Sequence, residues 1–194
     1  DLGLIAERGQ LVIANPIYEE VIPRALTYTT QVTITHETLW YVAPDGRLDM
    51  PKLLSAFQQF FREHSEHWVE RFDYKEAGPQ LLLQAFLQRI LNGGGRIERE
   101  YGLGRGRTDL LVLWPYATDA EQTQRVVIET KLRHGALETT IDSGLAQTWA
   151  YMDRSGAEAG HLVIFDRTPQ RPWEEKIFHR QHTYRDMVIN VWGM

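Results

Sequence analysis

The chain alternates between segments with helical spacing of apolar residues and shorter apolar runs of strand length. Helical spacing covers residues 49–64, with Pro51 suited to a first turn, and residues 78–95, which the Asn-Gly-Gly-Gly sequence ends. The runs RIEREY, TDLLVLW and RVVIETK then predict three successive strands. Residues 136–156 predict another helix, and HLVIFD predicts a strand after it. The tail, residues 176–194, predicts a polar segment and a last strand.

This order of elements predicts an α/β fold with a central mixed sheet flanked by helices. Short hairpin connections make antiparallel strand pairs, whereas a crossover helix joins parallel strands. TDLLVLW and the Val-Val-Ile of RVVIETK are apolar at consecutive positions, as strands buried on both faces are. We therefore expect helices on both sides of the sheet, in the order helix, three strands, helix, strand.

The first residues differ from the rest and predict a separate segment. LGLIAERGQLVIANPIYEEVIPRALTY reads as a strand, a turn and a short helix after Asn15-Pro16. We expect residues 1–48 to be the tail of an upstream domain or a linker, and residues 49–194 to form the main domain.

Composition narrows the class of protein. The 194 residues are 43% hydrophobic and 24% charged, which is typical of a soluble globular domain. The absence of cysteine excludes a thiolate nucleophile and a cysteine zinc site, and it fits a reducing compartment. No apolar run approaches a membrane span and no signal peptide is visible, so we expect a cytoplasmic location without membrane contact.

The formal net charge of −5 argues against a protein that coats nucleic acid non-specifically. A local site remains open, because basic residues somewhat outnumber acidic ones across residues 89–133.

Charged residues interrupt the two central strand runs. Successive side chains of a strand point to opposite faces, so Glu129 and Lys131 share a face, roughly 7 Å apart at the α-carbon. With Asp109 on the neighbouring strand and the same face, two carboxylates and one ammonium would converge. A divalent cation relieves the repulsion between the acids, and oxygen ligands suit Mg²⁺ or Mn²⁺. The alternative is a partly exposed ion-pair cluster at strand ends, but the combination of Asp with Glu-x-Lys favours a functional site.

The sequences RTD and IETK resemble the PD-(D/E)XK nuclease superfamily, whose core has the element order expected above. Thr108 stands where the superfamily usually has proline. The resemblance implies a restriction-endonuclease-like α-β-β-β-α-β core over about 73–166 and an enzyme that hydrolyses phosphodiester bonds. It implies that Asp109, Glu129 and the Thr130 carbonyl hold Mg²⁺ or Mn²⁺ and that Lys131 assists the attacking water.

The helix after this motif contains QTWAY, which resembles the QxxxY signature of RecB-like nucleases. Gln147 and Tyr151 lie one helical turn apart and face the same side. The resemblance implies that they support substrate or metal.

GLGRGRTDLLVL together with LVIANPIYEEVIPR is similar to the PD-(D/E)XK domain at the C-terminal end of proteins with an AAA-type ATPase-like region. This implies an upstream ATPase-like domain, since no Gly-x-x-x-x-Gly-Lys-Ser/Thr loop occurs in this chain. The superfamily often takes a further acid from its first helix, for which Glu76 is the best candidate. Asp73 is close, and a glutamate at a helix start is also favoured by the helix dipole.

Nucleic acid, with DNA expected, is the partner that these motifs imply. The GLGRG sequence precedes a strand, so we expect a hairpin turn rather than a phosphate-binding loop. Arg105, Arg107 and Arg133 are the candidates for contact with a nucleic-acid backbone.

Two rival functions keep the same fold. One is a module that binds nucleic acid or a partner protein without cutting. Intact Asp109, Glu129 and Lys131 weigh against it. The other is a structural module that docks an ATPase region, which the acidic net charge suggests, and it predicts no metal binding.

Overall fold

The chain divides into two compact units, Asp1–Trp40 and Tyr41–Met194. The computed structural model describes the backbone of residues 5–7, 11–13, 40–69, 77–91, 94–103, 106–116 and 122–194. In the first unit, β1 (Ile5–Glu7) and β2 (Leu11–Ile13) form an antiparallel pair. The helix expected after Asn15-Pro16 lies outside the described residues.

The second unit begins before the boundary expected at residue 49. The Tyr41 hydroxyl donates a hydrogen bond to the Ile90 carbonyl at 3.3 Å. The Leu48 amide donates to Gln124 Oε1 at 2.8 Å. Residues 41–48 are therefore part of the main unit by their contacts, while the assignment of the preceding segment to an upstream domain remains a prediction.

The second unit is an α/β fold built on a six-stranded mixed sheet in the order β3-β4-β5-β6-β8-β7. The hairpin-linked pairs β3–β4 and β4–β5 are antiparallel, and β5–β6, joined by a helix, is parallel, as predicted. The strands are β3 (Arg96–Leu103), β4 (Gly106–Pro115), β5 (Thr123–Leu132), β6 (Ala159–Phe165), β7 (Phe178–Tyr184) and β8 (Met187–Gly193).

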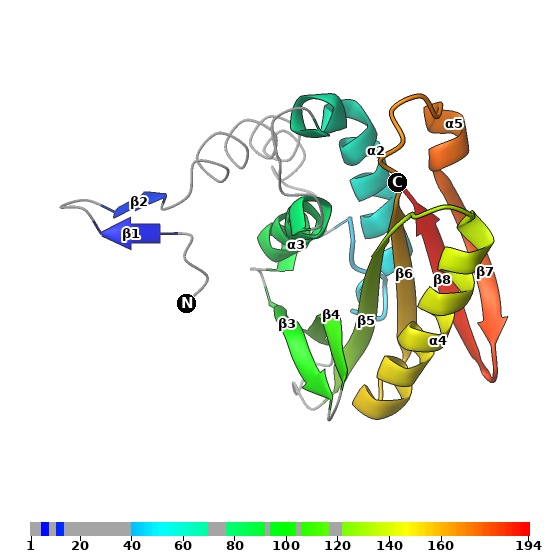
Figure 1. Ribbon diagram of the computed structural model, residues 1–194. Coiled ribbons are helices and arrows are strands. Elements are labelled where there is room, and N and C mark those ends of the chain that lie inside the picture. Colours follow the sequence, from blue (N-terminus) through cyan, green and yellow to red (C-terminus); the bar gives the residue numbers. More distant parts are fainter. Residues whose placement is uncertain are drawn as a thin grey trace. The chain divides into compact units, whose positions relative to one another are not determined.

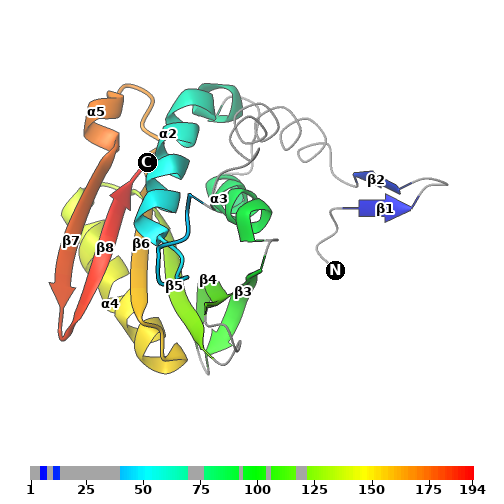
Figure 2. The ribbon, with the colours of Figure 1, turned by 180° about the vertical axis from the view of Figure 1, so that it is seen from behind.

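Helices cover both faces of the sheet, as the apolar strand runs predict. Figure 1 shows α4 (Leu137–Ser155) across one face, and Figure 2 shows α2 (Met50–Val69) and α3 (Ala77–Leu91) on the other. Leu110, Val126 and Ile128 of β4 and β5 are fully buried between these layers. Among the described helices, none is long and apolar enough to cross a membrane.

Sequence signals mark the start of α2 and the end of α4, although α2 continues to Val69, beyond the predicted residue 64. Asp49 caps α2, because its Oδ1 accepts the Lys52 amide at 3.1 Å. Gly156 ends α4 in the left-handed conformation at φ 63°, which a residue without a side chain adopts easily. The apolar stripe of α2 is core, as expected: the Phe57 ring meets that of Phe165 at a centroid distance of 6.5 Å.

Two glycines let α4 lie close to the sheet. A Cβ on Gly144 would come within 2.5 Å of a Leu162 methyl group, and one on Gly160 within 2.2 Å of the Met152 sulfur. Because real Cβ atoms do not approach other atoms so closely, the bare backbone at these two positions sets the distance between α4 and β6.

The tail differs from its prediction. The polar segment forms β7, an edge strand that pairs antiparallel with β8, and β8 inserts parallel to β6. An edge strand has solvent along one side and needs little apolar alternation, so its sequence reads as polar. The short helix α5 (Trp173–Lys176) precedes this hairpin.

Candidate active site

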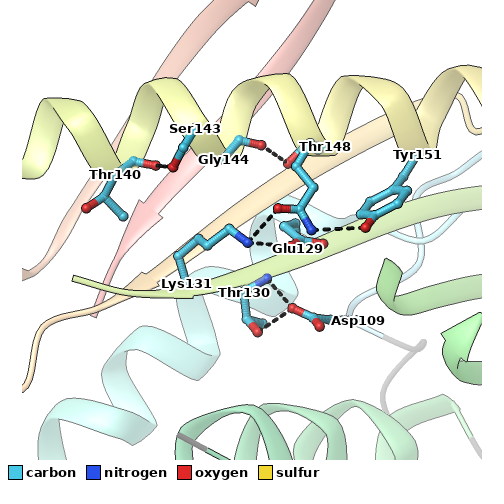
Figure 3. A network of polar contacts seen from close by, with 10 residues as sticks. Asp109, Glu129, Thr130, Lys131, Thr140, Ser143, Gly144, Thr148 and Tyr151 are labelled. Carbon is cyan, nitrogen blue, oxygen red and sulfur yellow. Dashed lines mark hydrogen bonds and ion pairs between the residues drawn. The ribbon is translucent and has the colours of Figure 1, made fainter. Parts of the chain in front are cut away.

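The residues expected to converge come from two neighbouring strands and the helix above them (Figure 3). The register pairs Leu110 of β4 with Ile128 of β5. The ladder ends at this pair. One step further along both strands, Asp109 is hydrogen-bonded to Thr130, and Glu129 leaves the sheet on the same face as Val127, two residues before it. This is the face that α4 covers, since Val127 of β5 packs with Ile141 and Leu145 of α4 in one apolar cluster.

Thr130 anchors the Asp109 carboxylate. Its backbone N–H and its hydroxyl both donate to Asp109 Oδ2, at 2.8 and 2.6 Å. In an antiparallel ladder the N–H and the carbonyl of one residue point to the same neighbouring strand. The Thr130 carbonyl therefore points toward β4 as well, on the side where Asp109 lies.

Glu129 is an acid buried almost completely, with only 1% of its surface exposed. Its Oε1 accepts a hydrogen bond from Lys131 Nζ at 2.9 Å, while its Oε2 is buried without a partner among the described residues. Burial and the charge of Asp109 raise the pKa of Glu129 to about 7, although contacts with Lys131 and the Asp109 backbone act in the opposite direction. The site therefore holds an acid that a further cation would stabilise.

Lys131 joins the acid to the helix. Its Nζ donates to Gln147 Oε1 at 2.7 Å as well as to Glu129. Gln147 Nε2 in turn donates to the Tyr151 hydroxyl at 3.0 Å. The one-turn spacing of Gln147 and Tyr151 on α4 thus forms a continuous polar chain that ends on Glu129 (Figure 3).

The arrangement offers oxygen ligands for a hard cation. Within the part of the chain that the structure describes, both bonds to Asp109 fall on Oδ2, and neither reaches Oδ1. Asp109 Oδ1 and Glu129 Oε2 therefore each have bonding capacity for a metal ion. The described residues contain no group of three or more His, Cys, Asp or Glu side chains that could hold a metal ion. Water and substrate oxygens would have to complete the coordination of a cation held by these two acids.

Of the other predicted site residues, two lie outside the described part of the chain. A third is described only by its backbone, and a fourth is bonded to an acid outside the site. Glu76 and Arg105 are not described. Arg107 lies in β4, where its backbone pairs with Gly102 in the expected hairpin, and nothing is described of its side chain. Arg133 follows β5 and donates to Asp166 Oδ2 at 3.0 Å and to the Gly135 carbonyl at 3.2 Å.

Asp166 and Arg171 complete an ion-pair network that the sequence patterns did not reveal. Arg171 also donates to Asp166 Oδ2, so that one carboxylate oxygen joins two guanidinium groups. Although burial acts to raise it, the pKa of Asp166 is lowered, because hydrogen bonds from Thr168 and the charge of Arg171 outweigh burial. The sequence showed only an acid, Asp166, at the end of the HLVIFD strand. Its partner Arg171 lies in an irregular loop, which no periodic pattern predicts.

The side-chain role of Thr130 was also missed. Strand alternation puts Thr130 on the opposite face from Glu129, and the sequence offered only its carbonyl as a ligand. Its hydroxyl reaches Asp109 because that carboxylate lies beside the β5 backbone. No protein-family model matches the chain, and no curated protein or solved structure matches it.

Proposed function

We propose that this chain is a metal-dependent nuclease that hydrolyses phosphodiester bonds, with DNA as the expected substrate. The observation that carries the proposal is Glu129 Oε2, which is buried without a partner among the described residues and lies near a second acid, Asp109. An unpaired buried carboxylate oxygen is costly, and the cost disappears when a cation binds.

The donor atoms fit Mg²⁺ or Mn²⁺. Asp109 Oδ1, Glu129 Oε2 and the Thr130 carbonyl are all oxygens, the ligands that hard divalent cations prefer. A site with so few protein ligands keeps water molecules on the cation, as magnesium sites that act on phosphates do. The cation would neutralise charge on the phosphate and lower the pKa of a bound water.

Lys131 has the contacts expected of a group that acts beside such a cation. Its ammonium lies against Glu129 and is about a quarter exposed, with 27% of the side chain accessible. From this position it can donate to the attacking water or to a phosphate oxygen, which would stabilise the anionic transition state. A neutral residue at position 131 would lose this interaction without removing a metal ligand.

The order of elements supports a restriction-endonuclease-like core. From α3 to β6 the chain runs helix, three strands, helix, strand, with both acids on the two central strands of that series. We extend the proposal to Glu76 as a further acid, to Arg105, Arg107 and Arg133 as nucleic-acid contacts, and to an ATPase-like domain upstream. The second candidate, a non-cutting binding module, leaves the intact Asp109, Glu129 and Lys131 set without a role.

The test is cleavage of linear, circular and single-stranded DNA and of RNA with Mg²⁺ or Mn²⁺. It is run with a chelator and beside Lys131→Ala, Asp109→Asn and the control Lys52→Ala, whose side chain is 60% exposed on α2. We expect cutting that needs metal and is lost in both site variants but not in the control. Metal binding without cleavage of any substrate would favour the non-cutting module, and the absence of both would refute the proposed metal site.

A further inference from the structure

Lys131 has two acceptors that differ in kind. Glu129 Oε1 belongs to a proposed metal ligand, whereas Gln147 Oε1, at 2.7 Å, belongs to a neutral amide. A carboxylate that binds a cation becomes a weaker hydrogen-bond acceptor for the Lys131 ammonium. The Gln147 amide is neutral and lies on another element, so metal binding does not weaken it as an acceptor. The Gln147 contact is therefore the one that holds Lys131 in place in both the metal-free and the metal-bound states.

The orientation of the Gln147 amide is fixed by chemistry. A lysine ammonium only donates hydrogen bonds, so the amide oxygen must face Lys131 and the amide nitrogen must face Tyr151. The Tyr151 hydroxyl accepts from that nitrogen at 3.0 Å. Tyr151 is itself buried, with 6% of its surface exposed, so its hydroxyl is a fixed point within the core under α4. Rotation of the Gln147 amide would break two hydrogen bonds together.

We infer that Gln147 is a positioning residue that holds the Lys131 ammonium beside Glu129, and that Tyr151 fixes the Gln147 amide in the orientation this requires. The inference rests on the proposed nuclease function for its catalytic consequence. It assigns Gln147 and Tyr151 to the support of Lys131, not to the metal or the substrate. The Gln147 oxygen and nitrogen are already bonded to Lys131 and Tyr151.

The packing of α4 against the sheet supports this assignment. Gly144, one turn before Gln147, sets the close approach of α4 to Leu162 of the sheet. A longer separation between helix and sheet would take the Gln147 amide out of reach of a side chain on β5. The contact between Gln147 and Lys131 therefore depends on the close packing that Gly144 allows.

Variants at Gln147 separate positioning from substrate contact. Gln147→Leu removes the acceptor with little change in size, whereas Gln147→Glu keeps an oxygen for Lys131 and one for the Tyr151 hydroxyl. We expect Gln147→Leu to lower kcat on the order of tenfold to a hundredfold with KM for DNA nearly unchanged, because a hydrogen bond to a charged group is lost. Gln147→Glu should recover at least tenfold of that loss. Tyr151→Phe should give a smaller fall in kcat.

A second readout follows the lysine itself in the metal-free protein and needs no activity. The chain's lysines are Lys52, Lys75, Lys131 and Lys176, so the nuclear magnetic resonance spectrum of the ammonium groups is simple to assign with a Lys131→Arg variant. A hydrogen-bonded, partly buried ammonium exchanges slowly enough to give a signal. We expect the Lys131 signal in the wild type, in Gln147→Glu and in the exposed α4 control Asp153→Asn, and its loss in Gln147→Leu.

The outcomes distinguish the two proposals. A wild-type chain that cuts nothing but loses the Lys131 signal in Gln147→Leu would refute the nuclease function and retain the positioning role. A wild-type chain that cuts, with both kcat and the Lys131 signal unchanged in Gln147→Leu, would refute the positioning role alone. A rise in KM with unchanged kcat would assign Gln147 to substrate binding instead and would also overturn the inference.

Discussion

Asp109 accepts two hydrogen bonds from Thr130 on a single carboxylate oxygen, one from the backbone amide at 2.8 Å and one from the hydroxyl at 2.6 Å. The carboxylate thereby takes the place of a strand carbonyl just beyond the last β4–β5 pair, Leu110 with Ile128. Two bonds to one oxygen fix the position of the acid against β5. The site is therefore preorganised on the Asp109 side before any cation binds.

Thr130→Val tests this anchoring. The substitution keeps the shape of the side chain and the backbone hydrogen bond but removes the hydroxyl donor. We expect a loss of about 1 kcal/mol in the free energy of unfolding and a several-fold weaker affinity for Mn²⁺, because Asp109 is then held by the backbone hydrogen bond alone. Chemical denaturation and calorimetric titration with Mn²⁺ measure the two effects.

Thr183→Val on the edge strand β7 is the matched control, since Thr183 is exposed and the change in side chain is identical. Its affinity for Mn²⁺ should equal that of the wild type. Equal affinities for all three proteins would mean that the Thr130 hydroxyl does not organise the metal site.

Metal affinity should depend on pH through Glu129. The pKa of this buried acid is raised to about 7, mainly by burial and then by the charge of Asp109. A cation binds the charged form, so a proton must leave Glu129 below that pH before metal can bind. With a pKa near 7, we expect affinity to be about tenfold stronger at pH 8 than at pH 6. Calorimetric titration at the two values checks this, and equal affinities would contradict the raised pKa.

Glu129→Gln should stabilise the metal-free protein at alkaline pH. A carboxyl whose folded-state pKa is raised contributes stability below its unfolded pKa, and this contribution is lost as pH rises through the folded pKa of about 7. The variant should therefore gain up to about 3 kcal/mol over the wild type at pH 8 and far less at pH 4.5. Urea unfolding in chelator at both values measures the difference, and a gain that is larger at pH 4.5 would reverse the sign.

Asp166→Asn should have the opposite pH dependence. The pKa of Asp166 is lowered, since Thr168 and Arg171 outweigh the effect of burial, so its contribution is present above the unfolded pKa and lost as pH falls through the folded one. We expect Asp166→Asn to lower the free energy of unfolding at pH 7 by about 1–3 kcal/mol and to matter less near pH 3. Asp186→Asn, on the β7–β8 turn, is an exposed control at a carboxylate bonded to Trp149. An equal loss at both pH values would show that Asp166 acts through packing alone.

The core of the site was predictable because it depends on strand periodicity. Glu129 and Lys131 had to share a face, and they are in contact at 2.9 Å. The hairpin between β4 and β5 then brings Asp109 against Thr130, close enough for its charge to act on Glu129. Helical spacing likewise placed Gln147 and Tyr151 on one side of α4, where they bond to each other. Regular elements fix such relationships locally, so a sequence is sufficient to state them.

The sequence did not reveal contacts that depend on irregular loops or on the place of a strand within the sheet. The role of Arg133 as a nucleic-acid contact stays a prediction, and no sequence pattern indicated that its guanidinium is bonded to Asp166, just after β6. The sequence did not predict that Gln147 bonds to Lys131, because this contact depends on the distance between α4 and the sheet. The polar segment of the tail forms the strand β7 because it pairs with the edge of β8. This pairing depends on the order of strands in the sheet, which no local sequence pattern encodes.

Gly144→Ala tests how closely α4 must lie to the sheet. Alanine favours a helix over glycine by about 1 kcal/mol, but its Cβ would meet a buried Leu162 methyl at 2.5 Å. We expect a net loss of about 1–3 kcal/mol in the free energy of unfolding. Leu162→Ala removes that methyl, so the double variant should be more stable than the sum of the single losses predicts, which denaturation in a double-mutant cycle measures. Strict additivity would mean that α4 does not contact β6 here and would remove the basis for the Lys131–Gln147 contact.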